Sequence, residues 1–207
     1  ADTPEKRRGV GIAWGGFNVT EGGGDSAEVA LELMPGNKIR KYDTWHAMGQ
    51  GATTGSLVVT LEALKEMHLT PEDIQLIQND TKTCPDTGMA GASRSLYMDG
   101  NATIIAANKL LAAMRKEDGT LRTYDEMKAE GIETKYLGRY ETNTTPGLCR
   151  LDPNTGIGDP TPAFTYCLNL AEVEVDTKTG KTTVLKFACV DFVGRIGNID
   201  AVNGQAY

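Results

Sequence analysis

The chain of 207 residues is 40% hydrophobic and carries a net charge of −7, with acidic and basic residues interspersed. This length allows one large domain or two small ones, and the acidic balance argues against a nucleic-acid-binding protein. The four cysteines lack metal-ligand spacing, and neither a signal peptide nor a stretch of ~20 apolar residues is present, so we expect a cytoplasmic protein without a zinc or iron–sulfur framework.

The N-terminal part of the chain is predicted to be extended. Residues 9–20 indicate a strand interrupted by glycines, whose third glycine falls one place too late for a dinucleotide-binding fingerprint. Residues 28–42 predict a hairpin, because apolar and polar residues alternate on either side of a turn at Pro35–Asn37.

Two later segments each predict a strand, a loop of small residues and an amphipathic helix. The first, residues 39–67, contains the run DTWHAMGQGATTGS, and the second, residues 74–115, contains the loop DTKTCPDTGMAGASRS. Two such loops at one end of a sheet would face each other across a single ligand. The apolar helix faces consist of Leu57, Leu61 and Leu64 in the first unit and of Ile104, Ala107, Leu111 and Met114 in the second.

Beyond residue 116 the sequence becomes more charged and then irregular. A short helix is predicted at 123–130, and the proline-rich segment 141–162 predicts a long surface loop that is functional or faces a partner. Residues 163–194 predict a long hairpin, and residues 198–207 predict no regular element. The half-buried face expected for this hairpin consists of Val173, Val175, Val184 and Phe187.

The two loops have the chemistry of an anion-binding site. Small residues between a strand and a helix let a ligand approach the backbone, and the free amides at the helix start bind anionic oxygen, although ordinary tight turns have the same composition. His46 alone is more typical of a structural histidine, and no feature of the sequence brings it to Cys84 as a nucleophile–base pair. The patterns therefore predict an α+β domain without a catalytic residue or a metal-ligand set.

Other reactive side chains near the loops and strands have simpler interpretations. Asp43, Asp80 and Asp86 border the loops and are typical of turn and cap residues. Cys167 and Cys189 lie in apolar, strand-like runs, so we expect both to be packed.

Several separated motifs resemble one known family. They are WHAMGQGATTGS, TLEAL, PEDI, CPDTGMAGASRS, GNA, AEVEVDTKTGKTTV and NIDAVNGQAY, which occur in this order over nearly the whole chain. The sequence resembles the molybdenum-binding domain of the xanthine oxidase/aldehyde oxidoreductase family, and it is most similar to the bacterial aldehyde oxidoreductases.

This resemblance implies an α+β fold with mixed sheets, hairpins and packed amphipathic helices that forms part of a molybdopterin-binding domain. Its cofactor would be molybdopterin, often a cytosine dinucleotide in bacteria, and the enzyme would oxidise aldehydes to carboxylic acids. The implied division is 1–116 with the cofactor loops, 117–162 with the charged helix and surface loop, and 163–207 with the hairpin. The cofactor-binding residues would be His46, Ala47, Met48, Gly49, Gln50 and Gly51 in the first loop and Gly88, Met89, Ala90, Gly91, Ala92 and Ser93 in the second.

The resemblance also implies parts that these 207 residues lack. The family's catalytic glutamate follows a Gly-Val-Gly segment, which does not occur here, and its cysteine-rich iron–sulfur domains are also missing. We therefore expect a fragment that works with the remaining domains or subunits, is inactive alone, retains no cofactor by itself, and self-associates through uncovered apolar surface. The alternatives are a non-catalytic assembly module and, less favoured, a hydrolase that depends on Cys84.

Overall fold

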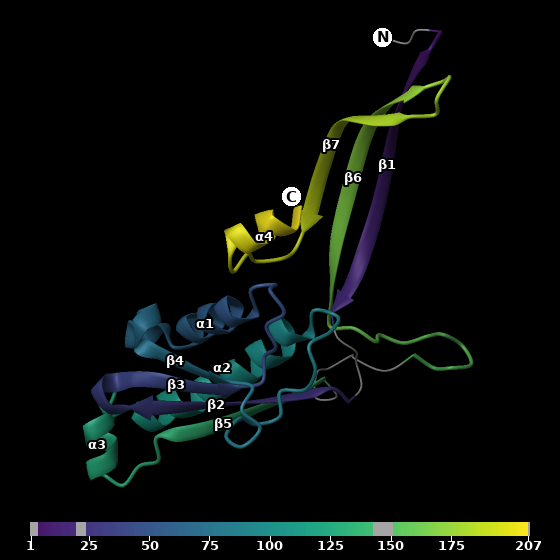
Figure 1. Cartoon of the computed structure of the whole chain (residues 1–207). Coiled ribbons are helices and arrows are strands. Elements are labelled where there is room, and N and C mark those ends of the chain that lie inside the picture. The colour runs from purple at the N-terminus through teal and green to yellow at the C-terminus, as the bar shows by residue number, and fades with distance from the viewer. Residues whose placement is uncertain (1–3, 20–23, 143–150, 207) are drawn as a thin grey trace.

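The structure is a computed structural model that describes residues 4–19, 24–142 and 151–206. Within these ranges it contains two sheets and four α-helices, which form two regions that differ in packing (Figure 1). We call the four-stranded sheet with its helices the body and the three-stranded sheet the arm. The strands of the body are β2 (Ser26–Met34), β3 (Lys38–Asp43), β4 (Ile74–Gln78) and β5 (Lys135–Glu141), and those of the arm are β1 (Lys6–Val19), β6 (Ala163–Asp176) and β7 (Thr182–Phe192).

The body sheet has the strand order β4-β3-β2-β5. Its β2–β3 pair is the predicted hairpin, antiparallel with Leu33 opposite Ile39 across the turn at Pro35–Asn37. In contrast, β3 and β4 run parallel, which the crossover through a helix allows. As a result, the segments that follow β3 and β4 both leave the sheet at the same end.

Helices pack on this sheet and enclose the main hydrophobic core. Helix α2 packs on β2 and β5, and α1 packs against α2. The fit to β5 is very close, since a Cβ added at Gly138 would lie 2.0 Å from the carbonyl oxygen of Ala102 in α2. The helices are α1 (Ala52–Ala63), α2 (Gly100–Met114), α3 (Tyr124–Ala129) and α4 (Ile199–Ala206).

Alternation along β2 explains why this region folds around one core. Side chains at every second position, from Ala27 to Leu33, are fully buried, as expected where one face of a strand meets packed helices. Each fully buried Leu or Val contributes about 1.5–3 kcal/mol relative to an exposed side chain. The core cluster is made of Leu31, Leu33, Ile39, Leu64, Ile74, Ala106, Ala107, Leu110, Leu111, Met114 and Met127.

The arm has the strand order β1-β6-β7 and is antiparallel throughout. It joins the N-terminal strand to the hairpin formed by β6 and β7, and it projects away from the body (Figure 1). Its outer strands β1 and β7 are largely exposed on both faces, and the central strand β6 is mostly half-buried, within the described residues. The arm is therefore a sheet that this part of the chain does not cover with a second layer.

Most predicted elements are confirmed, including the α+β class, the strand at 9–20 over its described residues 9–19, both hairpins, both strand–loop–helix units and the short helix near 123–130. Residues 151–162 form no helix or strand, and residues 143–150 of the predicted loop lie outside the described residues. No described helix is long and apolar enough to cross a membrane. The predicted division at residues 116 and 162 stays a prediction, although β1 pairs with β6.

Four expectations are wrong. The C-terminal segment forms α4, because the side chain of Asn198 accepts a hydrogen bond from the amide of Ala201 and starts a helix. Ile104 is 46% exposed because α2 turns Ala106 and Leu110 toward the core instead. The expected half-buried face of the hairpin fails at Val184 and Phe187, and the expected packing of Cys189 fails, since all three are exposed on β7.

Candidate cofactor-binding site

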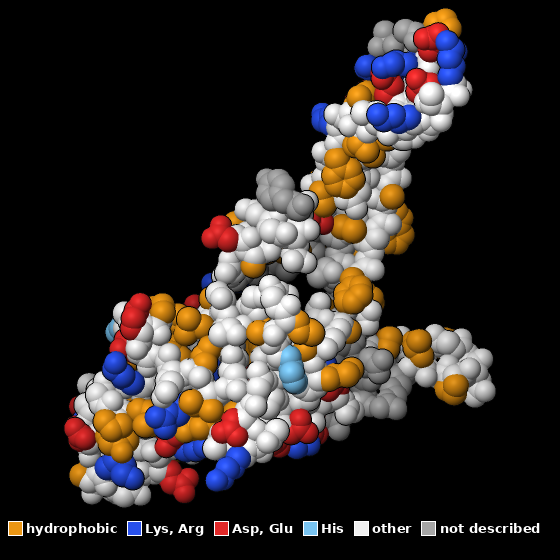
Figure 2. Space-filling view, viewed as in Figure 1, with side chains coloured by type: hydrophobic (Ala, Val, Ile, Leu, Met, Phe, Trp, Pro, Cys, Tyr) orange, Lys and Arg blue, Asp and Glu red, His pale blue; other side chains and the backbone are white. Residues whose placement is uncertain are grey.

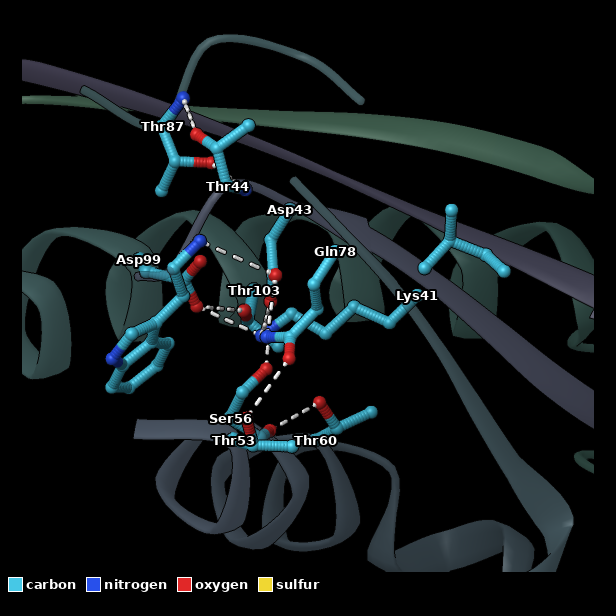
Figure 3. Close-up of polar contacts among 12 residues, drawn as sticks. Lys41, Asp43, Thr44, Thr53, Ser56, Thr60, Gln78, Thr87, Asp99 and Thr103 are labelled. Atoms are coloured by element: carbon cyan, nitrogen blue, oxygen red, sulfur yellow. Dashed lines mark hydrogen bonds and ion pairs between the residues drawn. The ribbon is translucent and has the colours of Figure 1, made fainter. Parts of the chain in front are cut away.

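The parallel pairing of β3 and β4 brings the two predicted loops together at one end of the body sheet. The amide of Asn79, just after β4, donates to the carbonyl of Asp43 at the end of β3. Thr44 and Thr87 then connect the loops directly, because each backbone amide donates to the other residue's hydroxyl, at 2.9 and 3.1 Å (Figure 3). The hydroxyl of Thr87 also donates to the carbonyl of Glu28 on β2. The two loops therefore lie side by side.

The first loop, residues 44–51, leads into α1 and is exposed from His46 onward. Gly49 and Gly51 have φ angles of 96° and 83°, and a Cβ at either position would meet nothing within 4 Å. The Gln50 side chain stays within the loop, accepting from the amide of Met48 at 2.6 Å and donating to the carbonyl of His46 at 2.9 Å. Gln50 thus stabilises the shape of the turn, and backbone groups form the outer surface of the turn.

Helix α1 begins without a side-chain cap, since its N-cap residue is Gly51. The amides of the first helical turn have no intrahelical partners and lie at the positive end of the helix dipole. Such amides bind phosphate oxygens. This helix start borders the open surface of the first loop.

The second loop, residues 79–94, has an unusual backbone where it meets the next helix. Ala92 and Ser93 have consecutive positive φ angles of 44° and 53°, a conformation that costs energy for residues other than glycine. A π-helix at Ser95–Asp99 follows and continues into α2. Strained backbone and π-helical turns are both frequent at functional sites. The second loop thus has the local features of a binding segment.

Arg94 holds this loop in place, and the sequence analysis did not single it out. Its guanidinium is buried and binds the Asp25 carboxylate in a bidentate pair at 2.7 and 2.8 Å. It also donates to the carbonyls of Ser26, Thr87 and Met89. Bidentate arginine pairs of this kind fix geometry as well as adding stability. The only sequence signal was a single arginine in a loop otherwise rich in small residues.

Gly88 is required by this arrangement. Its φ of 76° suits glycine, and a Cβ there would lie 2.8 Å from the guanidinium nitrogens of Arg94. A larger residue at position 88 would therefore displace the arginine that organises the loop.

A buried polar network lies beneath the two loops (Figure 3). Lys41 is fully buried in β3, and its ammonium lies 2.8 Å from Asp99 and 3.2 Å from Asp43. Asp43 also accepts hydrogen bonds from Ser56 of α1 and Gln78 of β4, at 2.7 and 2.8 Å. Asp43 also accepts from the amide of Trp45 at 3.4 Å, as expected of a turn residue, and its carboxylate in addition joins the two units below the site.

Asp99 is the least satisfied member of this network. Its Oδ1 accepts from Lys41 and Thr103, whereas Oδ2 is buried and has no hydrogen-bond partner. Burial raises the pKa of Asp99 to about 6, an effect that the charge of Lys41 opposes and that of Asp43 reinforces. The midpoint of Asp99 ionisation therefore lies near pH 6, well above that of an ordinary aspartate.

The remaining candidates give no catalytic centre. The Cys84 thiol donates to the carbonyl of Ile77 at 3.2 Å, and no hydrogen bond joins it to His46 in the described structure. Asp80 and Asp86 accept hydrogen bonds from amides two residues later, which confirms them as turn residues. Among the residues that the structure describes, no three His, Cys, Asp or Glu side chains gather as a metal-ligand set.

The donor groups of the two loops fit molybdopterin, a phosphate-bearing pterin. Residues 46–51 are exposed, the glycines face open space, and the start of α1 offers free amides. Residues 88–93 are exposed or half-buried beside them. The roles of the twelve individual residues stay a prediction. Because the two loops lie side by side, one large ligand could contact residues of both.

Comparisons with known proteins point to the same group. The family model described as "Molybdopterin cofactor-binding domain" matches residues 1–207. Aldehyde oxidoreductase of Megalodesulfovibrio gigas is 37% identical over 205 residues, which cover 99% of this chain and 22% of that protein. The crystal structure of the aldehyde oxidoreductase from Desulfovibrio desulfuricans has a TM-score of 0.90 and 40% identity, over 98% of this chain and 22% of that one.

A more distant relative extends the similarity to the wider family. Xanthine dehydrogenase of Dictyostelium discoideum is 26% identical over 152 residues, which cover 71% of this chain and 11% of that protein. The chain thus spans about a fifth of the length of the aldehyde oxidoreductases and less of this dehydrogenase. The resemblance inferred from the sequence motifs is confirmed: the chain belongs to the molybdopterin cofactor-binding domain family.

Proposed function

We propose that this chain is the cofactor-holding part of a molybdenum hydroxylase that oxidises aldehydes to carboxylic acids. The aldehyde oxidoreductase relatives support the substrate class, and the paired loops support the cofactor. When bound, molybdopterin supplies the molybdenum centre at which oxygen from water is transferred to the substrate. The residues of this chain hold and orient that group.

In this proposal each of the two loops binds a different side of the cofactor. The amides at the start of α1, together with Gly49 and Gly51, bind the phosphate groups, and we favour the cytosine dinucleotide form of the cofactor. The second loop, with Ala92 and Ser93 in its strained backbone, borders the other side. Arg94 and the network around Asp43 keep both loops in position.

The rest of the enzyme would complete the reaction. In the described part of the chain no hydrogen bond joins Cys84 to His46, and the chain covers only 22% of the aldehyde oxidoreductases it resembles. We therefore propose that other domains or subunits, including iron–sulfur domains, supply the catalytic glutamate and the electron path. These 207 residues are then inactive by themselves. The proposed location of the enzyme is the cytoplasm.

The observation that carries the proposal is the reciprocal Thr44–Thr87 pair, which holds the two loops side by side. The test is Gln50→Ala in the full-length protein encoded by the gene, followed by analysis of molybdenum and of cytidine nucleotide released by acid. We expect both to fall, because the loop loses the side chain that sets its shape, while the unfolding temperature stays the same.

Gln75→Ala is the matched control, because Gln75 is exposed and binds Arg40 outside the site. The proposal is contradicted if Gln50→Ala retains full molybdenum and nucleotide content. It is also contradicted if the unaltered full-length protein contains neither, a result that would favour the alternative of a non-catalytic assembly module, for which the exposed arm is the supporting observation.

A further inference from the structure

Two acidic side chains and one basic side chain are buried together beneath the paired loops. Lys41, Asp43 and Asp99 are fully buried, and we call them the buried charge cluster. With both carboxylates ionised its net charge is −1, because a single ammonium lies between two anions. Figure 2 shows other acidic and basic side chains intermixed on the visible surface of the body, where water screens them. The cluster has no such screening.

A purely structural role does not account for the second carboxylate of the cluster. The pair of Lys41 and Asp43 is already neutral, and a net charge in the interior of a protein is unfavourable. Asp99 adds such a charge, and its Oδ2 atom is buried without a hydrogen-bond partner. A buried polar atom without a partner is rare in folded proteins and is often connected with function.

The other elements packed around the cluster present uncharged side chains in the described structure. The π-helix at Ser95–Asp99 packs against α1, α2, β2 and β5. The uncharged neighbours are Ser56 and Thr60 of α1, Gln78 of β4, Thr103 of α2, Ala27 and Val29 of β2, and Tyr140 of β5. The charges that act on Asp99 are therefore those of Lys41 and Asp43.

The cluster is attached to the elements that carry both loops. Asp43 ends β3 directly before the first loop and accepts a hydrogen bond from Ser56 of α1 at 2.7 Å (Figure 3). Asp99 ends the π-helix that follows the second loop. Ser56 comes five residues after the N-cap Gly51, so about 7.5 Å of helix separates it from the start of α1. An anion at that helix start would lie on the order of 10 Å from the cluster.

At this separation an anion affects the ionisation of a buried carboxylate. Two unit charges about 10 Å apart, at an effective dielectric constant of about 20, change an ionisation equilibrium roughly tenfold. Phosphate oxygens at the loops would therefore oppose the negative charge of Asp99, which Lys41 does not neutralise. Protonation of Asp99 removes both the repulsion and the net charge of the cluster.

We propose that Asp99 is a positioning residue that takes up a proton from solvent when the phosphate-bearing cofactor binds, so that the loops rest on a neutral cluster. This inference rests on the proposed function, since it requires an anionic cofactor at the paired loops. In the chain described here the pKa of Asp99 is about 6, raised chiefly by burial, and the bound anion raises it further. The loops then hold the cofactor most tightly below about pH 6 and roughly tenfold less tightly above about pH 7.

The test is the pH dependence of cofactor release. Full-length protein encoded by the gene would be purified with its cofactor, and its loss of molybdenum and cytidine nucleotide would be followed from about pH 5 to about pH 8 at low ionic strength. We expect release to become about tenfold faster as the pH rises. Asp99→Asn should abolish this dependence and retain the cofactor at every pH as firmly as the unaltered protein does at low pH, because its side chain is always neutral.

Thr103→Val is the matched control, because it removes a hydrogen bond to Asp99 at 3.2 Å without changing any charge. The pH dependence should persist in this variant. Its midpoint should move to higher pH, since the Thr103 hydrogen bond lowers the pKa of Asp99. If Asp99→Asn does not fold, this shift decides, and an unchanged midpoint would overturn the inference.

Three results would refute the role of Asp99 and leave the proposed function intact. They are pH-independent release from the unaltered protein, an unchanged pH dependence in Asp99→Asn, and loss of cofactor at every pH from folded Asp99→Asn, which would indicate a structural role alone. Full-length protein that contains no molybdopterin would instead refute the proposed function, and the inference with it.

Discussion

The body contains one parallel strand pair and the arm is wholly antiparallel, and the two regions also differ in how they use their side chains. The body buries Leu31, Leu33 and Leu110 completely, and its two functional loops rest on a network of buried polar groups. The arm leaves Trp14 and Phe187 in solvent and buries little on either face. The body therefore buries the groups that support the site, whereas the arm leaves its large apolar side chains exposed in the described structure.

The largest expected difference between the regions comes from adding one methyl group to a glycine. Gly138→Ala should destabilise the body by about 5 kcal/mol or more, because the new Cβ would lie 2.0 Å from a carbonyl oxygen of α2. Gly11→Ala in the arm is the matched control, since a Cβ there meets nothing within 4 Å. Urea unfolding followed by circular dichroism measures both, and equal losses would remove the distinction between body and arm.

Breaking the buried pair of Arg94 should have the next largest effect. Arg94→Ala removes one donor from Asp25 and from three carbonyls. Removal of one partner of a fully buried pair costs roughly 3–5 kcal/mol, and the 24% exposure of the Asp25 side chain places this loss at the lower end. The second loop should also become susceptible to limited proteolysis near Met89. Arg8→Ala, whose pair with Glu174 is at the exposed tip of the arm, should leave stability nearly unchanged. An intact loop in Arg94→Ala would show that other contacts hold it.

A smaller effect, and one confined to the body, is expected from the ionisation of Asp99. Its pKa is raised from 3.8 to about 6 in the folded chain, so folding favours the protonated form between these values. The resulting stabilisation is present in full below about pH 4 and is lost as the pH rises through 6. Relative to Asp99→Asn, the unaltered chain should lose about 3 kcal/mol between these limits. Parallel stability curves for the two proteins would contradict this.

The sequence was sufficient to predict most elements of the body in their order, but not the strand β5. Alternation in β2 and the glycine-containing turn before β3 are local signals, and the loops at 44–51 and 79–94 follow directly from the strand–loop–helix order. The parallel pairing of β3 and β4, which decides that the loops are neighbours, follows from the helix between them.

The contacts that hold the site could not be predicted in the same way. Lys41 and Asp99 are 58 residues apart, and Arg94 and Asp25 are 69 apart, so their pairing depends on packing that no local pattern records. The expected half-buried face of the β6–β7 hairpin fails for a related reason. Alternation in β7 indicates a strand with an apolar face, but it does not reveal whether the layer that covers this face is within the same 207 residues.

Exposed methionines on the two loops offer the most direct test of the shared cofactor site. Met48 and Met89 are 74% and 73% exposed, one on each loop, whereas Met98, Met114 and Met127 are buried in the body and act as controls. Methionine oxidation would be compared by mass spectrometry in full-length protein with and without molybdopterin. We predict that loading the cofactor protects Met48 and Met89 together and leaves the three controls unchanged. Protection of only one of the two, or of neither, would contradict a single site formed by both loops.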